Sequence, residues 1–391
     1  MSRETKALVV SEVNGGFALE DVKLDALKPD EALVEIHATG ICHTDLSCAT
    51  GVLPAQFPAV FGHEGKILDF KPSLIDGADY EHPGAGIVLE VGSDITEVSK
   101  GDKVLMSYSY CGSCSQCASG HEPYCESLLP MNFGGQRDDG TTAFSRSDGS
   151  KVHSHFFGQS SFSRHAIVRR SSLVKVADTA QLELFAPLGC GLQTGAGAIF
   201  NTLNVTKGST VAIYGVGSVG LSAIMAARIR EAKEIIAVDI QPARLELAKE
   251  LGATSTINSN EVDVQETIKK LCPPLGVQYA LDCSGITKVV ETMIDCLGAR
   301  GRACSVGAPS PGKRAGVDVF SHLVNGREYV GCHQGESIAR EMAPYLIGEH
   351  DKGNYPLEKI ITTYDVQDYA QAIKDTKEGR TIKAVLKWQS I

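Results

Sequence analysis

A glycine-rich turn between a strand and a helix constrains the fold of this chain most. Residues 210–214 form a short apolar run typical of a strand, and the sequence Gly-Val-Gly-Ser-Val-Gly follows at 215–220, ahead of a stretch compatible with a helix. Residues 235–238 have the composition of a second strand, and the same alternation returns at 279–282 and 301–306. Strands that alternate with helices predict a parallel, doubly wound sheet, so we expect an α/β fold.

The same turn predicts a dinucleotide site. Gly215, Gly217 and Gly220 let the backbone approach a pyrophosphate, and the helix amino terminus offers N–H groups and the positive end of its dipole. Asp239 ends the next strand, 24 residues after Gly215, where a carboxylate accepts hydrogen bonds from ribose and repels a 2′-phosphate. This favours NAD over NADP, although Arg244 lies nearby and an arginine can receive that phosphate. A glycine turn that binds no nucleotide is the alternative interpretation.

A compact run of cysteines predicts a structural metal site. Four thiolates with spacings of two, two and seven residues can close a tetrahedral shell around one zinc ion, with no coordination position left open. Such a site holds a loop together. A disulfide or redox pair is the alternative, which we do not favour because this is a large chain without a secretory signal. The four residues are Cys111, Cys114, Cys117 and Cys125.

A second set of candidate metal ligands is dispersed along the chain. Cys42, His63 and Cys190 would supply two thiolates and one imidazole, which leaves a fourth position for water or substrate. Taken singly, each could be a buried packing residue or a structural histidine. Their occurrence together favours a catalytic zinc. One closed site and one open site therefore predict an enzyme with two zinc ions.

An open zinc beside a hydride acceptor indicates alcohol oxidation. Zinc lowers the pKa of a bound alcohol, and the alkoxide carbon can then release hydride to nicotinamide. Thr44 is positioned to accept the alcohol proton through its hydroxyl, and Asp45 could orient the distal nitrogen of His63. Glu64 could modulate the coordination of the metal, and His43 could reach the phosphates of the cofactor.

The composition excludes several classes of partner. Of 391 residues, 43% are hydrophobic and 21% charged, which is typical of a folded protein of two domains. The net charge of −10 argues against nucleic acid or an anionic membrane as a partner, because both need basic surface. No apolar run approaches the roughly 20 residues of a membrane span, and the amino terminus does not resemble a signal peptide. We expect a cytoplasmic protein that acts on a small molecule.

These features together resemble the zinc-dependent medium-chain alcohol dehydrogenases, and the likeness runs through nearly the whole chain. The resemblance implies a β-rich, GroES-like catalytic domain at residues 1–191 and 333–391, which carries both zinc sites. It implies a Rossmann domain with a doubly wound parallel sheet at residues 192–332. It also implies two zinc ions per chain, NAD as cofactor, and a homo-oligomer, either a dimer or a tetramer.

The resemblance assigns roles to individual residues. Two cysteines and one histidine are the known ligands of the catalytic zinc in that family, and they correspond here to Cys42, His63 and Cys190. The clustered cysteines correspond to the structural zinc ligands. Thr44 corresponds to the hydroxyl of the proton relay, and Asp239 falls with the three glycines on the NAD fingerprint.

A finer likeness concerns the substrate. Residues 131–135 and 155–162 are similar to the aryl-alcohol (benzyl-alcohol) dehydrogenase branch, which implies hydride transfer between a primary aromatic alcohol or aldehyde and NAD. One departure is Ser47, where many members have a histidine that ends the proton relay, so proton release would use water or His43. An enzyme similar to glutathione-dependent formaldehyde dehydrogenase is an alternative, but its substrate carries carboxylates and the sequence has no obvious basic cluster.

A second departure interrupts an expected strand. The family reads Gly-His-Glu-Gly directly into Ala-Gly-Ile-Val, but here residues 62–65 and 85–88 are separated by the 19 residues 66–84. A structureless insertion of this length is uncommon inside a compact domain. Our hypothesis is a retained intron, because residues 65–66 can be encoded with a GGTAAG donor and residues 82–84 with a CAG acceptor. The alternatives are a true surface loop, and a zinc- and nucleotide-binding homologue whose activity the insertion has impaired.

Overall fold

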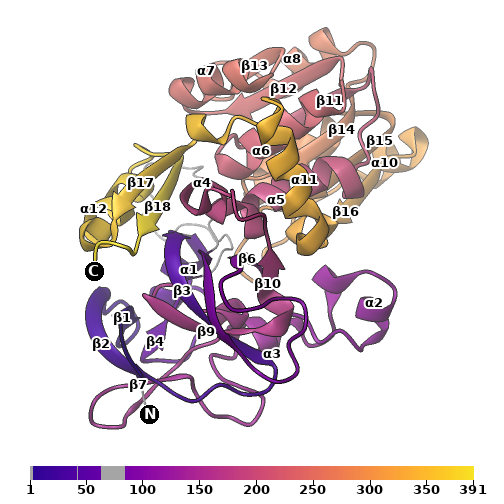
Figure 1. Cartoon of the computed structure of the whole chain (residues 1–391). Coiled ribbons are helices and arrows are strands. Elements are labelled where there is room, and N and C mark those ends of the chain that lie inside the picture. The colour runs from indigo at the N-terminus through magenta and orange to yellow at the C-terminus, as the bar shows by residue number, and fades with distance from the viewer. Residues whose placement is uncertain (1–2, 42, 63–83) are drawn as a thin grey trace.

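The computed structural model describes residues 3–41, 43–62 and 84–391, apart from the side chains of His43, Thr44 and Ser47. Figure 1 shows strands from the amino-terminal part of the chain in one half of the molecule and alternating strands and helices in the other half. The predicted fold class is confirmed, because one part is built from largely antiparallel sheets and the other from a parallel sheet with helices.

Two sheets build the β-rich part. The five-stranded sheet has the order β4-β1-β2-β7-β8, with the bounds Ala59–Val60, Arg3–Val10, Phe17–Leu24, Phe144–Ser145 and Lys151–Val152. The larger sheet has the order β10-β6-β5-β3-β18-β17, with the bounds Leu173–Lys175, Lys103–Met106, Gly84–Val91, Glu31–Gly40, Lys383–Lys387 and Ile361–Asp365. β9 (His165–Arg169) also pairs with β3. β3 is central and is buried on both faces except at Glu35 and His37, which explains its nearly continuous apolar sequence.

The carboxy-terminal strands belong to the same sheet as the amino-terminal part. β18 runs antiparallel to β3, with Val385 opposite Gly40, and β17 runs parallel to β18. In Figure 1 the yellow β18 lies beside the indigo β3. The chain therefore leaves the β-rich part, forms the parallel sheet, and returns.

The parallel sheet has the order β13-β12-β11-β14-β15-β16. All of its neighbouring pairs are parallel, and the order reverses between β11 and β14. The runs predicted at 210–214, 235–238, 279–282 and 301–306 fall on β11, β12, β14 and β15. In sheet order, the bounds are Ser255–Asn258, Glu234–Asp239, Thr210–Tyr214, Val277–Asp282, Leu297–Ser305 and Glu328–Gly331.

The helices differ in how much of their surface they bury. α6 is the helix that follows the glycine turn, and its residues from Ser218 to Ala227 are all buried, since it packs between the parallel sheet and α5.

None of the helices in the described ranges is long and apolar enough to cross a membrane. Helices α1 to α12 span His43–Ala49, Ser115–Ala118, Leu128–Phe133, Leu182–Phe185, Gly191–Gly197, Ser218–Ile229, Pro242–Leu251, Val264–Leu271, Thr287–Asp295, Val319–Asn325, Ala339–Asp351 and Tyr369–Lys377.

Candidate active site

The segments that flank the dispersed ligand candidates meet at one end of the larger sheet. β3 and β6 end there and β5 begins there, because β5 is antiparallel to both. Thr39 of β3 lies opposite Gly84 of β5, and Ala85 lies opposite Leu105 of β6. The chain continues from β3 through Ile41 to the position of Cys42. Cys42, His63 and Glu64 themselves lie outside the described residues.

Gly62, which precedes the predicted insertion, and Gly84, which is its last residue, both lie against Ser161. Gly62 has a φ of +91°, and a Cβ at this position would lie 2.7 Å from the carbonyl carbon of Ser161 and 2.1 Å from the nitrogen of Phe162. A Cβ at Gly84 would lie 2.5 Å from the Cβ of Ser161. The Ser161 hydroxyl is in turn 2.8 Å from the hydroxyl of Thr39. Only glycine fits at either position, and both glycines hold the chain against the sheet end.

Cys190 lies at the same end of the sheet. It sits between a short helical turn, Ala186–Gly189, and α5, and it is 3% exposed. The hydroxyl of Ser107, which follows β6, donates to the carbonyl of Gly189. The amide of Gln193 donates to the hydroxyl of Ser107 at 3.0 Å and to the carbonyl of Gly189 at 2.5 Å. These bonds hold Cys190, the third ligand candidate, at this end of the sheet. Ile41 and Gly62, the residues that precede Cys42 and His63, lie at the same end.

Asp45 positions α1 against the residue that precedes His63. Its carboxylate is fully buried and accepts a hydrogen bond of 2.9 Å from the backbone N–H of Gly62. The backbone of His43 and Thr44 lies in the first turn of the same helix. The predicted contact between Asp45 and His63, and the relay role of Thr44, stay predictions.

The four clustered cysteines come together as predicted. Their sulfur atoms all lie within 4.8 Å of one another, and the Cys111 and Cys117 sulfurs are 4.0 Å apart. A tetrahedral zinc with bonds of about 2.3 Å needs sulfurs that are about 3.8 Å apart. No other group of three or more such side chains with metal-binding spacing occurs in the described ranges. The geometry and the donor set therefore fit a structural zinc, held by Cys111, Cys114, Cys117 and Cys125.

Backbone N–H groups already stabilise thiolates in this cluster. Cys114 N–H points at the Cys111 sulfur at 3.3 Å, and Cys111 N–H points at the Cys125 sulfur at 3.3 Å. Hydrogen bonds from the backbone of Ser113 and Cys114 lower the pKa of Cys111 to about 6. The backbone thus favours the thiolate, the form that binds zinc, at Cys111, whereas burial raises the pKa of Cys117 to about 12 and also raises the pKa of Cys125.

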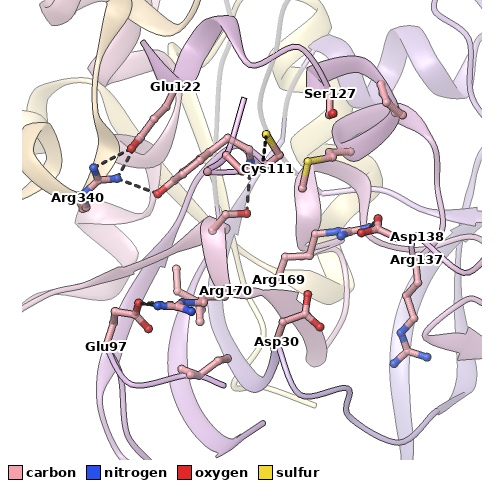
Figure 2. Close-up of a pocket in the computed structure, with 18 of the residues that line it drawn as sticks. Asp30, Glu97, Cys111, Glu122, Ser127, Arg137, Asp138, Arg169, Arg170 and Arg340 are labelled. Atoms are coloured by element: carbon pink, nitrogen blue, oxygen red, sulfur yellow. Dashed lines mark hydrogen bonds and ion pairs between the residues drawn. The ribbon is translucent and has the colours of Figure 1, made fainter. Parts of the chain in front are cut away.

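A groove of about 1200 Å³ runs beside this cluster (Figure 2). Arg340 bonds to Glu122 at 2.7 Å on its rim, and Arg169 bonds to Asp138 at 2.8 Å. Arg170 pairs with Glu97 on another wall. Since these charges are already matched, the groove offers little to a charged substrate. Its lining includes neither Cys190 nor Gly62, so we assign it no part in the chemistry.

The glycine turn has the geometry of a pyrophosphate cradle. Gly215 has a φ of +83°, in the left-handed region that favours glycine, and Gly217 caps the amino terminus of α6. A Cβ at Gly220 would lie 2.1 Å from the carbonyl oxygen of Gly215, so a side chain there would separate α6 from β11. The turn lies beside the point where the strand order reverses, where such sheets bind dinucleotides.

Asp239 lies at the end of β12 beside a cavity of about 480 Å³. Its carboxylate accepts hydrogen bonds from the backbone of Val216 at 2.8 Å, Ile240 at 2.7 Å and Gln241 at 2.9 Å. Gly215, Ile240 and Ile286 also line the cavity, whose size and apolar walls suit the adenosine half of a dinucleotide. Arg244 is 2% exposed in α7 and is not part of this lining, and its role at the cofactor stays a prediction.

Comparison with known proteins gives the family. The pattern described as zinc-binding dehydrogenase matches residues 218–348, and the alcohol dehydrogenase GroES-like domain matches residues 28–77 and 70–178. A geraniol dehydrogenase of Castellaniella defragrans is 36% identical over 97% of this chain and 97% of its own length. This chain belongs to the zinc-dependent alcohol dehydrogenases. The GroES-like match is split into two pieces, and the first piece ends and the second begins within the predicted insertion.

Solved structures agree with this assignment to the zinc-dependent alcohol dehydrogenases. The benzyl alcohol dehydrogenase of Acinetobacter calcoaceticus is 37% identical, covers 98% of this chain and 99% of its own, and superposes with a TM-score of 0.90. An alcohol dehydrogenase zinc-binding domain protein from Burkholderia ambifaria is 42% identical, with 99% of both chains covered and a TM-score of 0.92. An S-(hydroxymethyl)glutathione dehydrogenase of a Synechocystis species is 34% identical over 98% of this chain and 99% of its own length. The predicted family and its zinc-dependent oxidoreductase chemistry are confirmed.

Three polar side chains that hold Cys190 or its neighbour Gly189 are not indicated by the sequence. Ser107, Gln193 and Gln334 come from three distant segments, and Gln334 donates a hydrogen bond to the Cys190 sulfur at 3.1 Å. Serine and glutamine are common residues, and nothing in their local sequence marks them. Only the fold brings them together.

Proposed function

We propose that this chain is an NAD-dependent alcohol dehydrogenase that oxidises a primary aromatic alcohol to its aldehyde and catalyses the reverse reduction. The main support is the convergence of three segments at one sheet end: the chain leading to Cys42, the chain leading to His63, and Cys190. The aromatic preference is supported by the 37% identity to a benzyl alcohol dehydrogenase over almost the full length.

Each residue of the proposed site has a distinct task. Cys42, His63 and Cys190 would hold a zinc ion, which when bound polarises the alcohol oxygen, while NAD accepts the hydride. Thr44 would take the alcohol proton through its hydroxyl, and Asp45 would orient His63 from the helix that also holds Gly62. Glu64 would modulate coordination, and His43 or water would carry the proton onward.

NAD is the proposed cofactor rather than NADP. The three glycines would bind its pyrophosphate at the amino terminus of α6, and Asp239 would accept hydrogen bonds from the ribose. A 2′-phosphate would be placed beside a buried carboxylate, which repels it. Arg244 is buried in α7 and is not among the residues that line the cavity.

We propose the domain division that the resemblance implies. Residues 1–191 and 333–391 would form the catalytic domain, and 192–332 the NAD-binding domain, with 66–84 an insertion. The pairing of β18 with β3 supports the return of the chain to the first domain. We also infer a cytoplasmic location, because the clustered cysteines can bind metal only when they are reduced.

We propose that the chain is a homo-oligomer that associates through α10 and β16. α10 buries none of its residues, and Val319, Phe320 and Leu323 are 75%, 74% and 73% exposed. β16 is the edge strand of the parallel sheet, and its Tyr329 is 41% exposed. A second copy fits this surface, because two such strands can pair about a two-fold axis and cover both apolar helices.

The first experiment measures NADH formation from benzyl alcohol by the full chain, with geraniol and S-(hydroxymethyl)glutathione as comparison substrates. We expect benzyl alcohol to give the highest kcat/KM, and a zinc chelator to abolish the rate. A preference for S-(hydroxymethyl)glutathione would overturn the aromatic assignment. No NADH from any of the three, despite two bound zinc ions, would support the impaired-homologue alternative.

A further inference from the structure

Gln334 lies in a tightly packed turn between β16 and α11. The turn Gln334–Glu336 has three consecutive residues with positive φ, namely +52° at Gln334, +65° at Gly335 and +48° at Glu336. Residues other than glycine rarely adopt this conformation. A Cβ at Gly335 would lie 2.6 Å from the carbonyl oxygen of Thr194, so the turn is pressed directly onto α5. The packing of the turn against α5 thus holds this unfavourable backbone conformation and fixes the position of Gln334.

The side chain of Gln334 is 6% exposed and faces Cys190. Its Nε2 donates to the Cys190 sulfur at 3.1 Å, and its Oε1 lies 3.4 Å from the hydroxyl of Thr194. The same hydroxyl donates to the Cys190 carbonyl at 2.8 Å. A thiolate has no hydrogen to donate, so only the N–H side of the amide can face it favourably.

The turn is held from the opposite side by the segment that carries the structural thiolates. Tyr124, next to Cys125, donates from its hydroxyl to the Glu336 carboxylate at 3.0 Å. His333 Nδ1 lies 2.9 Å from the carbonyl of Pro123. The amide of Asn201 donates to the carbonyl of Gly335 at 3.0 Å. Gln334 therefore has little freedom to turn away from Cys190.

We propose that Gln334 is a positioning residue of the active site, which orients the Cys190 thiolate toward the metal. This inference rests on the proposed function, because it takes Cys190 as a ligand of the catalytic metal. A hydrogen bond to a ligating sulfur fixes its direction, and the loss of such a bond weakens metal binding. Sequence spacing does not indicate this role, since 144 residues separate Gln334 from Cys190.

Two substitutions separate this role from a general effect on folding. Gln334→Glu keeps the shape but replaces the N–H donor with a carboxylate oxygen that faces a thiolate. Gln334→Asn keeps the amide and suits the positive φ, but it is one methylene too short to reach the sulfur. Gln371→Glu is the matched control, because Gln371 is exposed on α12 and bonds only to Asp375 among the described partners.

The test loads the full-length chain with Co²⁺ in place of zinc and records the sulfur-to-cobalt charge-transfer band, together with metal affinity from competition with a chelator. For both Gln334 variants we expect one metal per chain to bind about 10- to 100-fold more weakly and its band to shift. The other metal, held by the cysteine cluster, should bind unchanged, and Gln371→Glu should match the parent.

Two results would overturn the inference in different ways. Parent-like metal affinity and an unshifted band in both Gln334 variants, in a chain that oxidises benzyl alcohol, would exclude the role of Gln334 and leave the proposed function intact. A parent chain that binds only one metal would remove Cys190 from the ligand set, and with it both proposals.

Discussion

Glu31 is a buried carboxylate at the start of β3 that joins three distant segments. It accepts hydrogen bonds from Arg137 through both oxygens at 2.8 Å, from His155 Nε2 at 2.9 Å and from the backbone of Lys28 at 2.9 Å. Burial raises the pKa of Glu31, but the hydrogen bonds from His155 and Arg137 outweigh this effect and lower the pKa to about 2. Burial also lowers the pKa of His155, which donates as a neutral imidazole. The residues after the thiolate cluster are thereby fixed to the central strand.

We predict that Glu31→Gln lowers the free energy of unfolding by about 3–5 kcal/mol at pH 7, because glutamine has a single acceptor and leaves the buried Arg137 with only the exposed Asp25 as a charge partner. A depressed pKa stabilises the fold above the unfolded value of about 4.3, and this contribution disappears as pH falls toward 2. Urea titrations at pH 7, 5, 4 and 3 should show that the free energy of unfolding of the parent falls with pH, and that the variant lacks this fall. Glu90→Gln, at an exposed pair with Arg3, is the control and should behave as the parent. If Glu31→Gln lost as much stability in acid as the parent does, the stabilising role of the ionised Glu31 would be contradicted.

At the scale of elements, the contact between β11 and α6 requires a residue without a side chain at position 220. Gly220→Ala would place a Cβ 2.1 Å from the carbonyl oxygen of Gly215, so the helix must move away from the strand. We expect a loss of about 1–3 kcal/mol in stability and at least tenfold weaker NAD binding, because the α6 amino terminus moves with the helix. Gly348→Ala in α11 is the control, since a Cβ there meets nothing within 4 Å, and it should be neutral or slightly stabilising. Calorimetry of folding and of NAD binding measures both effects, and unchanged NAD affinity in Gly220→Ala would count against the cradle.

The ends of the insertion lie close enough to be joined without it. Gly62 and Gly84 both contact Ser161, and three residue steps span about 10 Å. In a chain without residues 66–84, Gly65 can take the place of Gly84 at the start of β5. We predict that this deletion variant folds, binds two zinc ions and oxidises alcohol at least as fast as the full chain.

Transcript sequencing and a side-by-side assay check this prediction. A major message that encodes residues 66–84 would reject the retained-intron hypothesis. An inactive deletion variant beside an active full chain would show that the segment is a working loop of the enzyme.

At the scale of the whole molecule, the exposed apolar surface of α10 and β16 predicts assembly. We expect the parent to have the mass of a dimer or tetramer by light scattering, and the double variant Phe320→Asp/Leu323→Asp to be a monomer, because burial of charged carboxylates in the interface is unfavourable. Leu129→Asp, at a residue 68% exposed on α3, is the control and should keep the parent mass. A monomeric parent, or a double variant that keeps the parent mass, would place the interface elsewhere.

Sequence reasoning worked where chemistry is encoded in short spacings. The thiolate cluster was predictable because four cysteines within one loop must lie near one another whatever the rest of the chain does. The glycine turn was predictable because each glycine answers a local requirement, a positive φ at Gly215 and the absence of a side chain at Gly220. Asp239 followed from its place at the end of the next parallel strand. The role of Arg244, which is buried in α7, stays a prediction.

The sequence by itself determined the fold class, the family and the closed thiolate site, since strand and helix propensities, glycine conformations and ligand spacings act over a few residues. Only the tertiary structure decided that Ser107 bonds to Gly189 and that Gln334 reaches the Cys190 sulfur. It also decided that Glu31 meets Arg137 and His155, and that α10 lies uncovered. These contacts join residues that are mostly more than 80 positions apart. Their formation depends on the order and register of strands in a sheet, which is the result of the packing of the whole chain and not of any segment of it.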